Sequence, residues 1–333
     1  MSNYIKSIVP FVANRSDFMD NLESSPVAIT LAAKAIMPEH IDTLRACMEC
    51  YPSVDPKYGN RTSIGYAMKD TYQLSTDGRS FHLRVEHNQK LLPNDVVKKR
   101  LEEKVRNYFE EVGEYPSRTE RKCWKDEIEM EMLATALVRS RTYTVSFVVF
   151  GDEICVSVCN AATKLAEEIF EFVYKTLISN SFSPYKFFST GNQIADAGHA
   201  IGTFFSDHFL GINRGVELSQ SVKLKDPDKG AVSITDYDGI AMQAAYDEMF
   251  CNGYPVVAID IKSAISGESE IYMSVDHKLR VSKISMSLED LHDRYGLAVD
   301  EEAEGVELFL AEALIYTSEV MELIGLMRKI TAS

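Results

Sequence analysis

Hydrophobic residues follow two different periods along the chain, which predicts strands as well as helices. Phe81, Leu83 and Val85 alternate with polar neighbours, as side chains of a half-buried strand do. Between Val97 and Val112, apolar residues instead recur every three or four positions, which predicts one face of an amphipathic helix. We therefore expect an α+β fold with mixed or antiparallel sheets.

A helical hairpin is predicted after this strand. Gly113 and Pro116 end the first helix, because both residue types interrupt a helical backbone. Ser117 and Glu120 then form the S-x-x-E pattern of a capping box, which predicts a second helix that runs to about Ala136. Since the turn is short, we expect the two charged helices to lie antiparallel.

Further elements are predicted on both sides of the hairpin. Gly151-Asp152 is a β-hairpin turn signal between two apolar runs, and Asn160 is expected to cap the following helix, which runs to Ile178. Expected strands cover residues 4–12, 63–68, 71–74, 142–150, 153–159, 254–263, 269–275 and 278–284. Other expected helices cover residues 38–50, 191–206, 239–251 and 301–330.

The last helix is apolar on more than one face. Phe309, Leu310 and Leu314 belong to one stripe, whereas Leu308 and Ile315 occupy other faces. A surface helix needs only one apolar face. We therefore expect this helix either to be central to its domain or to pack against another chain.

Composition indicates a globular protein with a core of ordinary size. The 333 residues are 45% hydrophobic and 26% charged, which is enough for two or three packed units. The opening residues lack the pattern of a secretory signal, and no stretch has the roughly 18 apolar residues of a membrane span, so we expect a cytoplasmic protein. Six cysteines without regular spacing fit reduced thiols better than a disulfide framework.

Negative charge is concentrated towards the C-terminus. The net charge is -15, but residues 236–333 hold 19 acidic and 7 basic residues, a balance of -12, which leaves -3 for residues 1–235. Between Lys98 and Arg141, 11 basic residues stand against 10 acidic ones. Such an asymmetry suggests regions with different partners. We therefore divide the chain into three regions. The central region covers residues 1–92 and 141–235, the hairpin region covers residues 93–140, and the acidic C-terminal region covers residues 236–333.

Few residues carry a recognisable catalytic pattern. Cys47 and Cys50 form a C-x-x-C, but a structural zinc needs a second ligand pair, so we predict no metal or cofactor. The histidines are scattered and no nucleophile motif lies beside them. Asp228, followed by Asp260 and Lys262, superficially resembles the carboxylates and lysine of a metal-dependent nuclease. The gap between them is long, so this is the weakest hypothesis.

The basic stretch has a structural explanation as well as a functional one. Lys98 with Glu102, Lys99 with Glu103, and Glu102 with Arg106 are spaced for ion pairs along one helix. The residues alone favour a solvated helical hairpin held by such pairs, without a visible catalytic centre.

Residues 80–178 resemble the recombination-associated RdgC family. The resemblance is carried by FHLRVEHNQKLLPNDVVKKRLEEKV, by SRTERKCWKDEIEMEMLATAL, and by the hairpin segment TYTVSFVVFGDEICVSVCNAATKLAEEIF. It implies a non-catalytic, ring-shaped homodimer that encircles double-stranded DNA without reading its sequence and restrains RecA-type strand exchange, with a nucleoid-associated location. It also implies a protruding hairpin that bears an openable gate at its tip, and a larger dimer interface in the C-terminal region.

The resemblance also assigns residues. It implies that Leu133 and Leu137 form the gate and that the last helix contributes to the dimer interface through Phe309, Leu310, Leu314 and Met321. The implied DNA-binding residues are Lys98, Lys99, Lys104, Arg118, Arg121, Lys122, Arg139 and Arg141. Asp236 and Asp238 stand where the family pattern is basic, which puts duplex affinity in question.

Two alternatives stay open. In the first, the acidic C-terminal region engages a basic surface on a recombination protein or nuclease, or mimics DNA. In the second, Asp260 and Lys262 belong to a metal-dependent exonuclease.

Overall fold

The computed structural model divides the chain into two compact units. Unit 1 comprises residues 1–48, 71–83 and 144–333, and unit 2 comprises residues 49–70 and 84–143. The predicted hairpin region lies within unit 2. The structure describes residues 5–14, 38–57, 59–67, 72–74, 80–151, 153–178, 188–189, 216–226, 230–235, 244–245, 247–249, 251–264, 270–277, 280–286 and 305–331.

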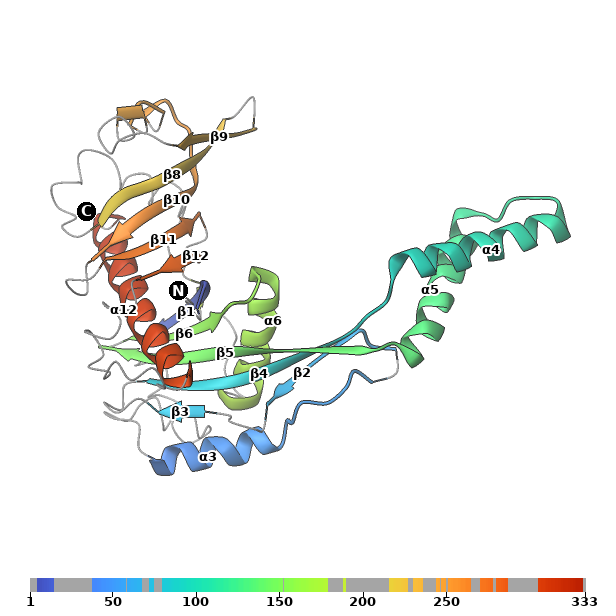
Figure 1. The fold of residues 1–333 in the computed structure, drawn as a ribbon, viewed down its shortest axis with the longest axis horizontal. Helices are drawn as coiled ribbons and strands as arrows, with labels where there is room; N and C mark the ends of the chain where they lie inside the picture. The colour runs from blue at the N-terminus through green and yellow to red at the C-terminus, as the bar shows by residue number, and fades with distance from the viewer. Residues whose placement is uncertain are drawn as a thin grey trace. The chain divides into compact units, whose positions relative to one another are not determined.

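An antiparallel sheet forms the framework of unit 1 (Figure 1). Its strand order is β4-β5-β6-β1-β12-β11-β10-β8-β9, with β3 beside β4 and β7 beside β1. The bounds are β1 Ser7–Asn14, β3 Tyr72–Leu74, β4 Ser80–Lys90, β5 Val138–Phe150, β6 Glu153–Cys159, β7 Phe188–Ser189, β8 Val216–Asp226, β9 Gly230–Thr235, β10 Val256–Ser263, β11 Ile271–Asp276 and β12 Val281–Ser285. β4 and β5 also contribute residues to unit 2.

Strand β1 is buried on both faces, because a helix covers each of them. Ile8 and Val12 belong to the apolar core that includes α12 (Gly305–Thr331). Phe11 points the other way and stacks on Phe170 of α6 (Thr163–Val173), with ring centroids 4.0 Å apart. A π-helical turn, Tyr174–Ile178, continues α6.

Helix α12 is central to unit 1, which decides between the two expectations for residues 312–324. It crosses the sheet face formed by β10–β12 (Figure 1), and most of its side chains in this range are buried. Two of them are carboxylates: Glu312 accepts a hydrogen bond from the Ile5 backbone N–H at 2.8 Å, and Glu319 accepts one from Ser263. Met321 is only 2% exposed.

These burials bear on the proposed dimer interface. Met321 lies inside its own chain, so its side chain is not available to a second copy in this conformation. Leu314 is partly exposed. The side chains of Phe309 and Leu310 lie outside the described residues.

Unit 2 contains a strand pair and the helical hairpin. β2 (Thr62–Tyr66) pairs antiparallel with β4, and α4 (Asn94–Val112) and α5 (Arg118–Thr135) form the hairpin. Residues 51–53 run along the free edge of β2, where the Ser53 N–H donates to the Tyr66 carbonyl at 3.0 Å. The approach is close enough that a Cβ on Gly65 would lie 2.5 Å from the Pro52 carbonyl oxygen.

Most predicted elements are confirmed within a few residues, including α3 (Pro38–Glu49), both hairpins and the meander β10–β12. The expected helix 191–206 lies outside the described residues. Of the expected helix 239–251, residues 244–245, 247–249 and 251 are described and are helical. The β8–β9 hairpin was not predicted.

The predicted cap at Asn160 is wrong. The helix begins after Ala162, which makes no side-chain cap, and Asn160 adopts a left-handed backbone with φ 59°. Its side-chain oxygen accepts a hydrogen bond from the Lys6 N–H at 2.8 Å, and its own N–H donates to Ser7 at 2.9 Å. Asn160 therefore ties the end of β6 to β1 instead of starting α6.

Candidate nucleic-acid interface

Local sequence signals fix both ends of the turn in the helical hairpin. Gly113 ends α4 in the left-handed conformation, with φ 80°, and its N–H donates to the Phe109 carbonyl at 2.9 Å. Ser117 and Glu120 form the predicted capping box, with bonds of 2.8 and 3.2 Å in the two directions. The pKa of Glu120 lies below its usual value, because hydrogen bonds to its carboxylate from the Ser117 side chain and from the Ser117 backbone N–H favour the charged form.

The two helices are held together by a small apolar core and one ion pair. Val97, Ile128 and Leu133 are buried. The Lys104 ammonium lies 2.7 Å from the Glu127 carboxylate and 5.3 Å from the ring centroid of Trp124. Lys104 was assigned to DNA binding, but this charge is already paired across the hairpin.

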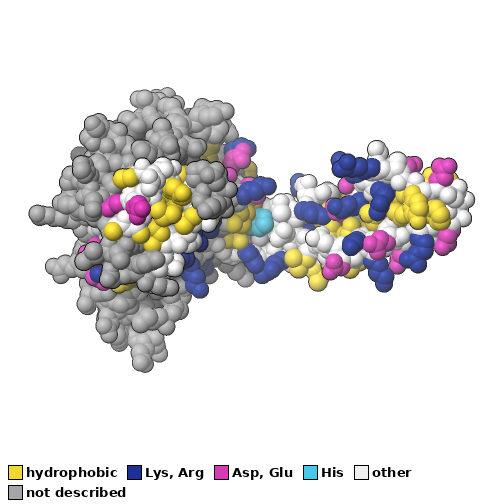
Figure 2. All heavy atoms as spheres, turned by 90° about the horizontal axis from the view of Figure 1, so that it is seen from above, with side chains coloured by type: hydrophobic (Ala, Val, Ile, Leu, Met, Phe, Trp, Pro, Cys, Tyr) yellow, Lys and Arg dark blue, Asp and Glu magenta, His cyan; other side chains and the backbone are white. Residues whose placement is uncertain are grey.

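The remaining assigned cations are exposed and make no ion pair with any residue that the structure describes. They are Lys98, Lys99, Arg118, Arg121, Lys122, Arg139 and Arg141. Lys and Arg side chains follow the hairpin along the face in Figure 2. The expected pairs of Lys98 with Glu102, Lys99 with Glu103 and Glu102 with Arg106 do not form within this described segment. An (i, i+4) ion pair does form in α5, between Lys125 and Glu129, so the prediction of such pairs is confirmed only in part.

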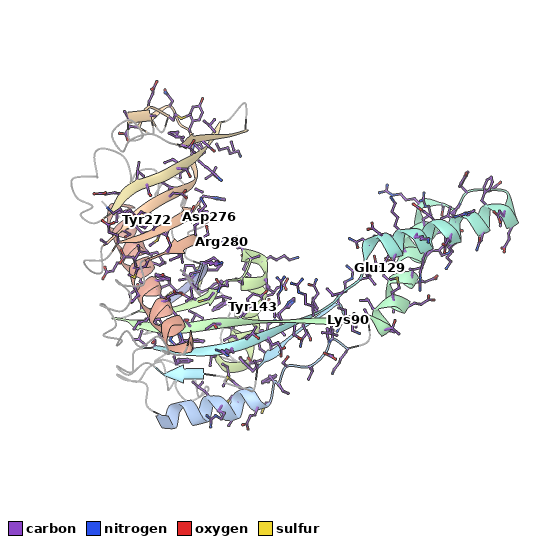
Figure 3. The ribbon with its side chains drawn as sticks, viewed as in Figure 1. Lys90, Glu129, Tyr143, Tyr272, Asp276 and Arg280 are labelled. Carbon is purple, nitrogen blue, oxygen red and sulfur yellow. The ribbon has the colours of Figure 1, made fainter. Side chains whose placement is uncertain are left out.

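A carboxylate between α5 and the strands accounts for two other cations. Glu129, labelled in Figure 3, accepts a hydrogen bond from Arg61 at 2.9 Å and lies 3.6 Å from the ammonium of Lys125. Both interactions are within unit 2. They position α5 against the edge strand β2 and leave the seven exposed cations unneutralised.

Charge is arranged against the dipole of α5. The N-terminal end of a helix favours acidic groups and the C-terminal end favours basic ones. Helix α5 carries Glu120 in its first turn, as the dipole favours, but it also carries Arg118, Arg121 and Lys122 in its first turns, and its last turn holds no basic residue. The helix dipole does not explain the placement of these three cations.

The two gate residues lie in different environments. Leu133 is buried in the hairpin, whereas Leu137 is 78% exposed. Leu137 follows α5, and its carbonyl accepts a hydrogen bond from the Leu91 N–H at 2.8 Å. Leu137 therefore lies at the base of the hairpin, where β4 and β5 meet the helices, and not at its tip as expected.

The tip carries aromatic residues that the sequence reasoning did not single out. Phe109 and Tyr115 stack with ring centroids 4.5 Å apart, and both are exposed, Tyr115 by 75%. Val112 beside them is also exposed. The sequence segment FEEVGEY indicates these exposed residues, because its apolar side chains lie next to Gly113, which ends the helix, and cannot all face α5.

The two units differ sharply in charge. Unit 2 contains 16 basic and 15 acidic residues, a charge balance of +1. Because the net charge of the whole chain is -15, the charge balance of unit 1 is -16. Asp236 and Asp238 lie outside the described residues. The placement of cations in unit 2 therefore agrees with the local analysis of the basic stretch, and the acidic character belongs to the other unit.

Asp260 and Lys262 lie two residues apart on β10, where Asp260 is buried and Lys262 is half-buried, and each has its own partner. Asp260 accepts a hydrogen bond from Ser221 at 2.7 Å and pairs with Lys283 at 3.0 Å. Lys262 lies 2.5 Å from Glu270. Partial burial acts to raise the pKa of Asp260, but hydrogen bonds from Ser274, Ser221 and Lys283 outweigh it and hold this pKa below its usual value.

Potential metal ligands are dispersed in the described part of the chain. No group of three or more His, Cys, Asp or Glu side chains is placed there to hold a metal ion. Asp228 lies outside the described residues, so the nuclease pattern that includes it stays a prediction. Cys155 and Cys159 are buried in the core, as expected. Among the described helices, none is long and apolar enough to cross a membrane.

Comparison with known proteins identifies the family. The hairpin with unpaired cations and the antiparallel sheet define an α+β protein with a candidate polyanion-binding surface. A protein-family model with the description "Putative exonuclease, RdgC" matches residues 40–330, nearly the whole chain. The chain belongs to the RdgC family, and this membership suggests a recombination-associated, DNA-binding role. No curated protein matches the chain.

Proposed function

We propose that this protein binds double-stranded DNA without sequence preference, as a homodimer, and thereby restrains RecA-type strand exchange. The observation that carries the proposal is the set of exposed, unpaired cations on the hairpin and on β5. Contacts from Lys and Arg to phosphates supply affinity without reading bases. No catalytic step is needed for this role.

The arrangement of the cations suits a phosphate backbone. Lys98 and Lys99 lie near the start of α4, Arg118 and Arg121 lie at the start of α5, and Arg139 lies on β5. They therefore cover both ends of the hairpin. α4 is 19 residues long, so at 1.5 Å per residue the cations extend over about 28 Å, roughly eight base pairs of duplex.

A second copy would strengthen this binding. Two hairpins offer twice as many phosphate contacts, and a closed dimer would release DNA more slowly than an open surface. The local balance of +1 in unit 2 is small for a DNA-binding protein, so a dimer compensates for few contacts per chain.

Duplex binding across a salt series tests the proposal. Each phosphate contact contributes a slope of about -0.9 to the logarithm of the binding constant against the logarithm of salt concentration. We expect the triple variant Arg118→Glu, Arg121→Glu, Lys122→Glu to weaken binding and to reduce the magnitude of this slope by about 5, since three contacts are lost in each of the two copies. Absence of wild-type binding at low salt would refute the proposal.

A matched control separates local contacts from net charge. The triple variant Lys164→Glu, Lys223→Glu, Lys225→Glu makes the same change in net charge at exposed positions of unit 1. It should retain most of the wild-type slope. Equal loss in both triple variants would assign the effect to the overall field of the protein.

The balance of -16 in unit 1 favours one alternative, an acidic interaction protein or DNA mimic. Under this alternative the Arg118, Arg121 and Lys122 reversals would leave the restraint of strand exchange intact. Under the DNA-binding proposal they abolish it. The exonuclease alternative predicts Mg²⁺- or Mn²⁺-dependent DNA digestion that Asp260→Asn removes.

A further inference from the structure

Two cysteines lie one helical turn apart at the end of α3. Cys47 is partly buried in the last turn of this helix, and Cys50 is exposed directly after its last residue, Glu49. Both are thiols in this structure. A C-x-x-C pair in which one thiol is exposed has the arrangement needed for thiol–disulfide exchange.

Helical spacing brings the two backbones close enough for a disulfide. Residues three apart in an α-helix have Cα atoms about 5 Å apart, and a disulfide needs a Cα separation of roughly 4.4–6.8 Å. Their Cβ atoms lie about 5–6 Å apart, whereas a disulfide holds the Cβ atoms at about 3.5–4.5 Å. Closure therefore requires a backbone movement of about 1–2 Å at Cys47 or at Cys50.

The helix that carries Cys47 is held in place by apolar packing. Leu44 and Met48 are fully buried, so a shift of the last turn of α3 would displace both side chains from a close-packed core. Cys50 instead is exposed and lies in the turn after the helix. The movement that closes a disulfide is therefore easier at Cys50.

Cys50 leads into a segment, residues 51–53, that is bonded to β2; we call it the clip segment. The Tyr51 carbonyl accepts a hydrogen bond from the Tyr66 N–H at 3.0 Å, and the Ser53 N–H donates to the Tyr66 carbonyl at 3.0 Å. The side-chain amide of Asn88 also donates to the Ser53 hydroxyl oxygen at 2.8 Å. Because Tyr51 is the next residue in the chain, a displacement of Cys50 acts first on the bond between Tyr51 and Tyr66.

We propose that Cys47 and Cys50 form a reversible disulfide that loosens the clip segment from β2. The oxidant is a small disulfide such as oxidised glutathione. The Cys50 thiolate attacks one glutathione sulfur and releases the first glutathione; the Cys47 thiolate then attacks the Cys50 sulfur and releases the second. The two cysteine protons end on the two released glutathione thiols, so two protein thiols are oxidised and one glutathione disulfide is reduced.

The hydrogen bonds of the clip segment make this disulfide easy to reduce. A disulfide that must displace a bonded segment is less stable than an unstrained one, and strained or exposed disulfides are the readily reduced ones. The bond therefore forms under oxidising conditions and opens again in excess reduced glutathione. This reversibility distinguishes a switch from a permanent structural crosslink.

Thiol mapping after incubation with oxidised glutathione tests the bond. The exposed Cys123 and Cys251 are first changed to Ser in the full-length chain. Tryptic cleavage after Arg45 and Lys57 places both thiols of the pair in one peptide, which should become two hydrogen atoms lighter and resist alkylation. Excess reduced glutathione should restore both thiols. No reaction, a glutathione adduct on Cys50 without the internal bond, or a bond that reduced glutathione does not open would each overturn the proposal.

Single serine variants in the same background are the matched controls. Cys47→Ser should stop at the mixed disulfide, with glutathione retained on Cys50. Cys50→Ser should react more slowly, because the remaining Cys47 is partly buried. Equally fast adduct formation in the two variants would contradict the assignment of Cys50 as the attacking thiol.

Hydrogen exchange tests whether the disulfide acts on the clip segment. The amides of Ser53 and Tyr66 should exchange roughly tenfold faster in the oxidised chain than in the reduced one, because local opening becomes easier. The Glu120 amide, which donates to Ser117 in the hairpin, should exchange at the same rate in both forms. Unchanged exchange at Ser53 and Tyr66, or equally faster exchange at all three amides, would overturn a switch confined to the clip segment.

Discussion

Lys104 and Glu127 connect the two helices of the hairpin: their charged groups lie 2.7 Å apart, and the ammonium also lies over Trp124. This lysine belongs to the basic stretch, but its charge is already paired within the fold. The hairpin therefore contains two kinds of cation, one paired within the fold and one left exposed. The distinction can be measured.

Lys104→Ala should reduce stability slightly and leave the electrostatics of DNA binding unchanged. The lysine and its partner are partly exposed, so we expect a loss of about 1 kcal/mol or less in the free energy of unfolding. The salt slope of duplex binding should stay at the wild-type value, whereas Arg121→Ala should lower its magnitude by about 1.8, because one contact is lost in each copy of the dimer. Equal slopes in the two variants would contradict this division.

Ser117→Ala should loosen the start of α5. It removes the hydroxyl that accepts from the Glu120 N–H, and loss of such a cap typically costs about 1 kcal/mol. The lowered pKa of Glu120 adds stability that is present above its unfolded pKa and is lost as pH falls through the lower folded value. Thermal unfolding near pH 4 should depend more steeply on pH in wild type than in Glu120→Gln, and this difference reports the contribution of Glu120.

His82 should make the stability of unit 1 depend on pH. Burial lowers its pKa from 6.5 to about 4, and its Nδ1 lies 2.8 Å from the Ser146 hydroxyl oxygen. Between these two values the unfolded chain binds a proton that the folded chain does not, so stability falls as pH is lowered from 6.5 towards 4. The loss is at most about 3 kcal/mol.

Denaturant unfolding of wild type and His82→Gln isolates this contribution from those of the carboxylates. The difference in free energy of unfolding between the two proteins should change across the window and be constant above pH 7. A difference independent of pH would show that His82 titrates normally in the fold.

Lys283 combines an ion pair with an unfavourable backbone. Its φ is 53°, a left-handed conformation that a side chain disfavours and glycine tolerates. Lys283→Ala and Lys283→Gly both remove the pair with Asp260, but only the glycine variant relieves the backbone. We expect Lys283→Gly to be the more stable of the two by about 1 kcal/mol in thermal or denaturant unfolding. A Lys283→Ala variant that is more stable than Lys283→Gly would contradict backbone strain at this position.

Local signals in the sequence were sufficient for much of the fold. The period from Val97 to Val112 and the capping box at Ser117 depend on residues within one or two turns, and both predictions are confirmed. The prediction that Asn160 caps a helix was wrong because its hydrogen-bond partners, Lys6 and Ser7, are far away in the sequence. A residue that accepts a long-range hydrogen bond resembles a helix cap in every local respect.

The candidate interface was predictable in composition but not in detail. The sequence located the basic stretch, yet it did not distinguish Lys104, which is paired with Glu127, from Arg121, which is exposed. That difference depends on which side of α4 faces α5. β8 and β9 were missed because bulges against β10 interrupt the regular alternation of β8.

The hydrogen bond between Ile5 and Glu312 has a consequence for how the chain folds. It joins residues 307 positions apart, and β1 lies between β6 and β12 in the sheet. Unit 1 cannot complete this sheet on a ribosome until its last strand and helix have been synthesised, whereas the segments of unit 2 end at residue 143. The hairpin is therefore expected to fold early, while β1, which can pair with β6, gains its second neighbour β12 and its cover α12 only later in synthesis.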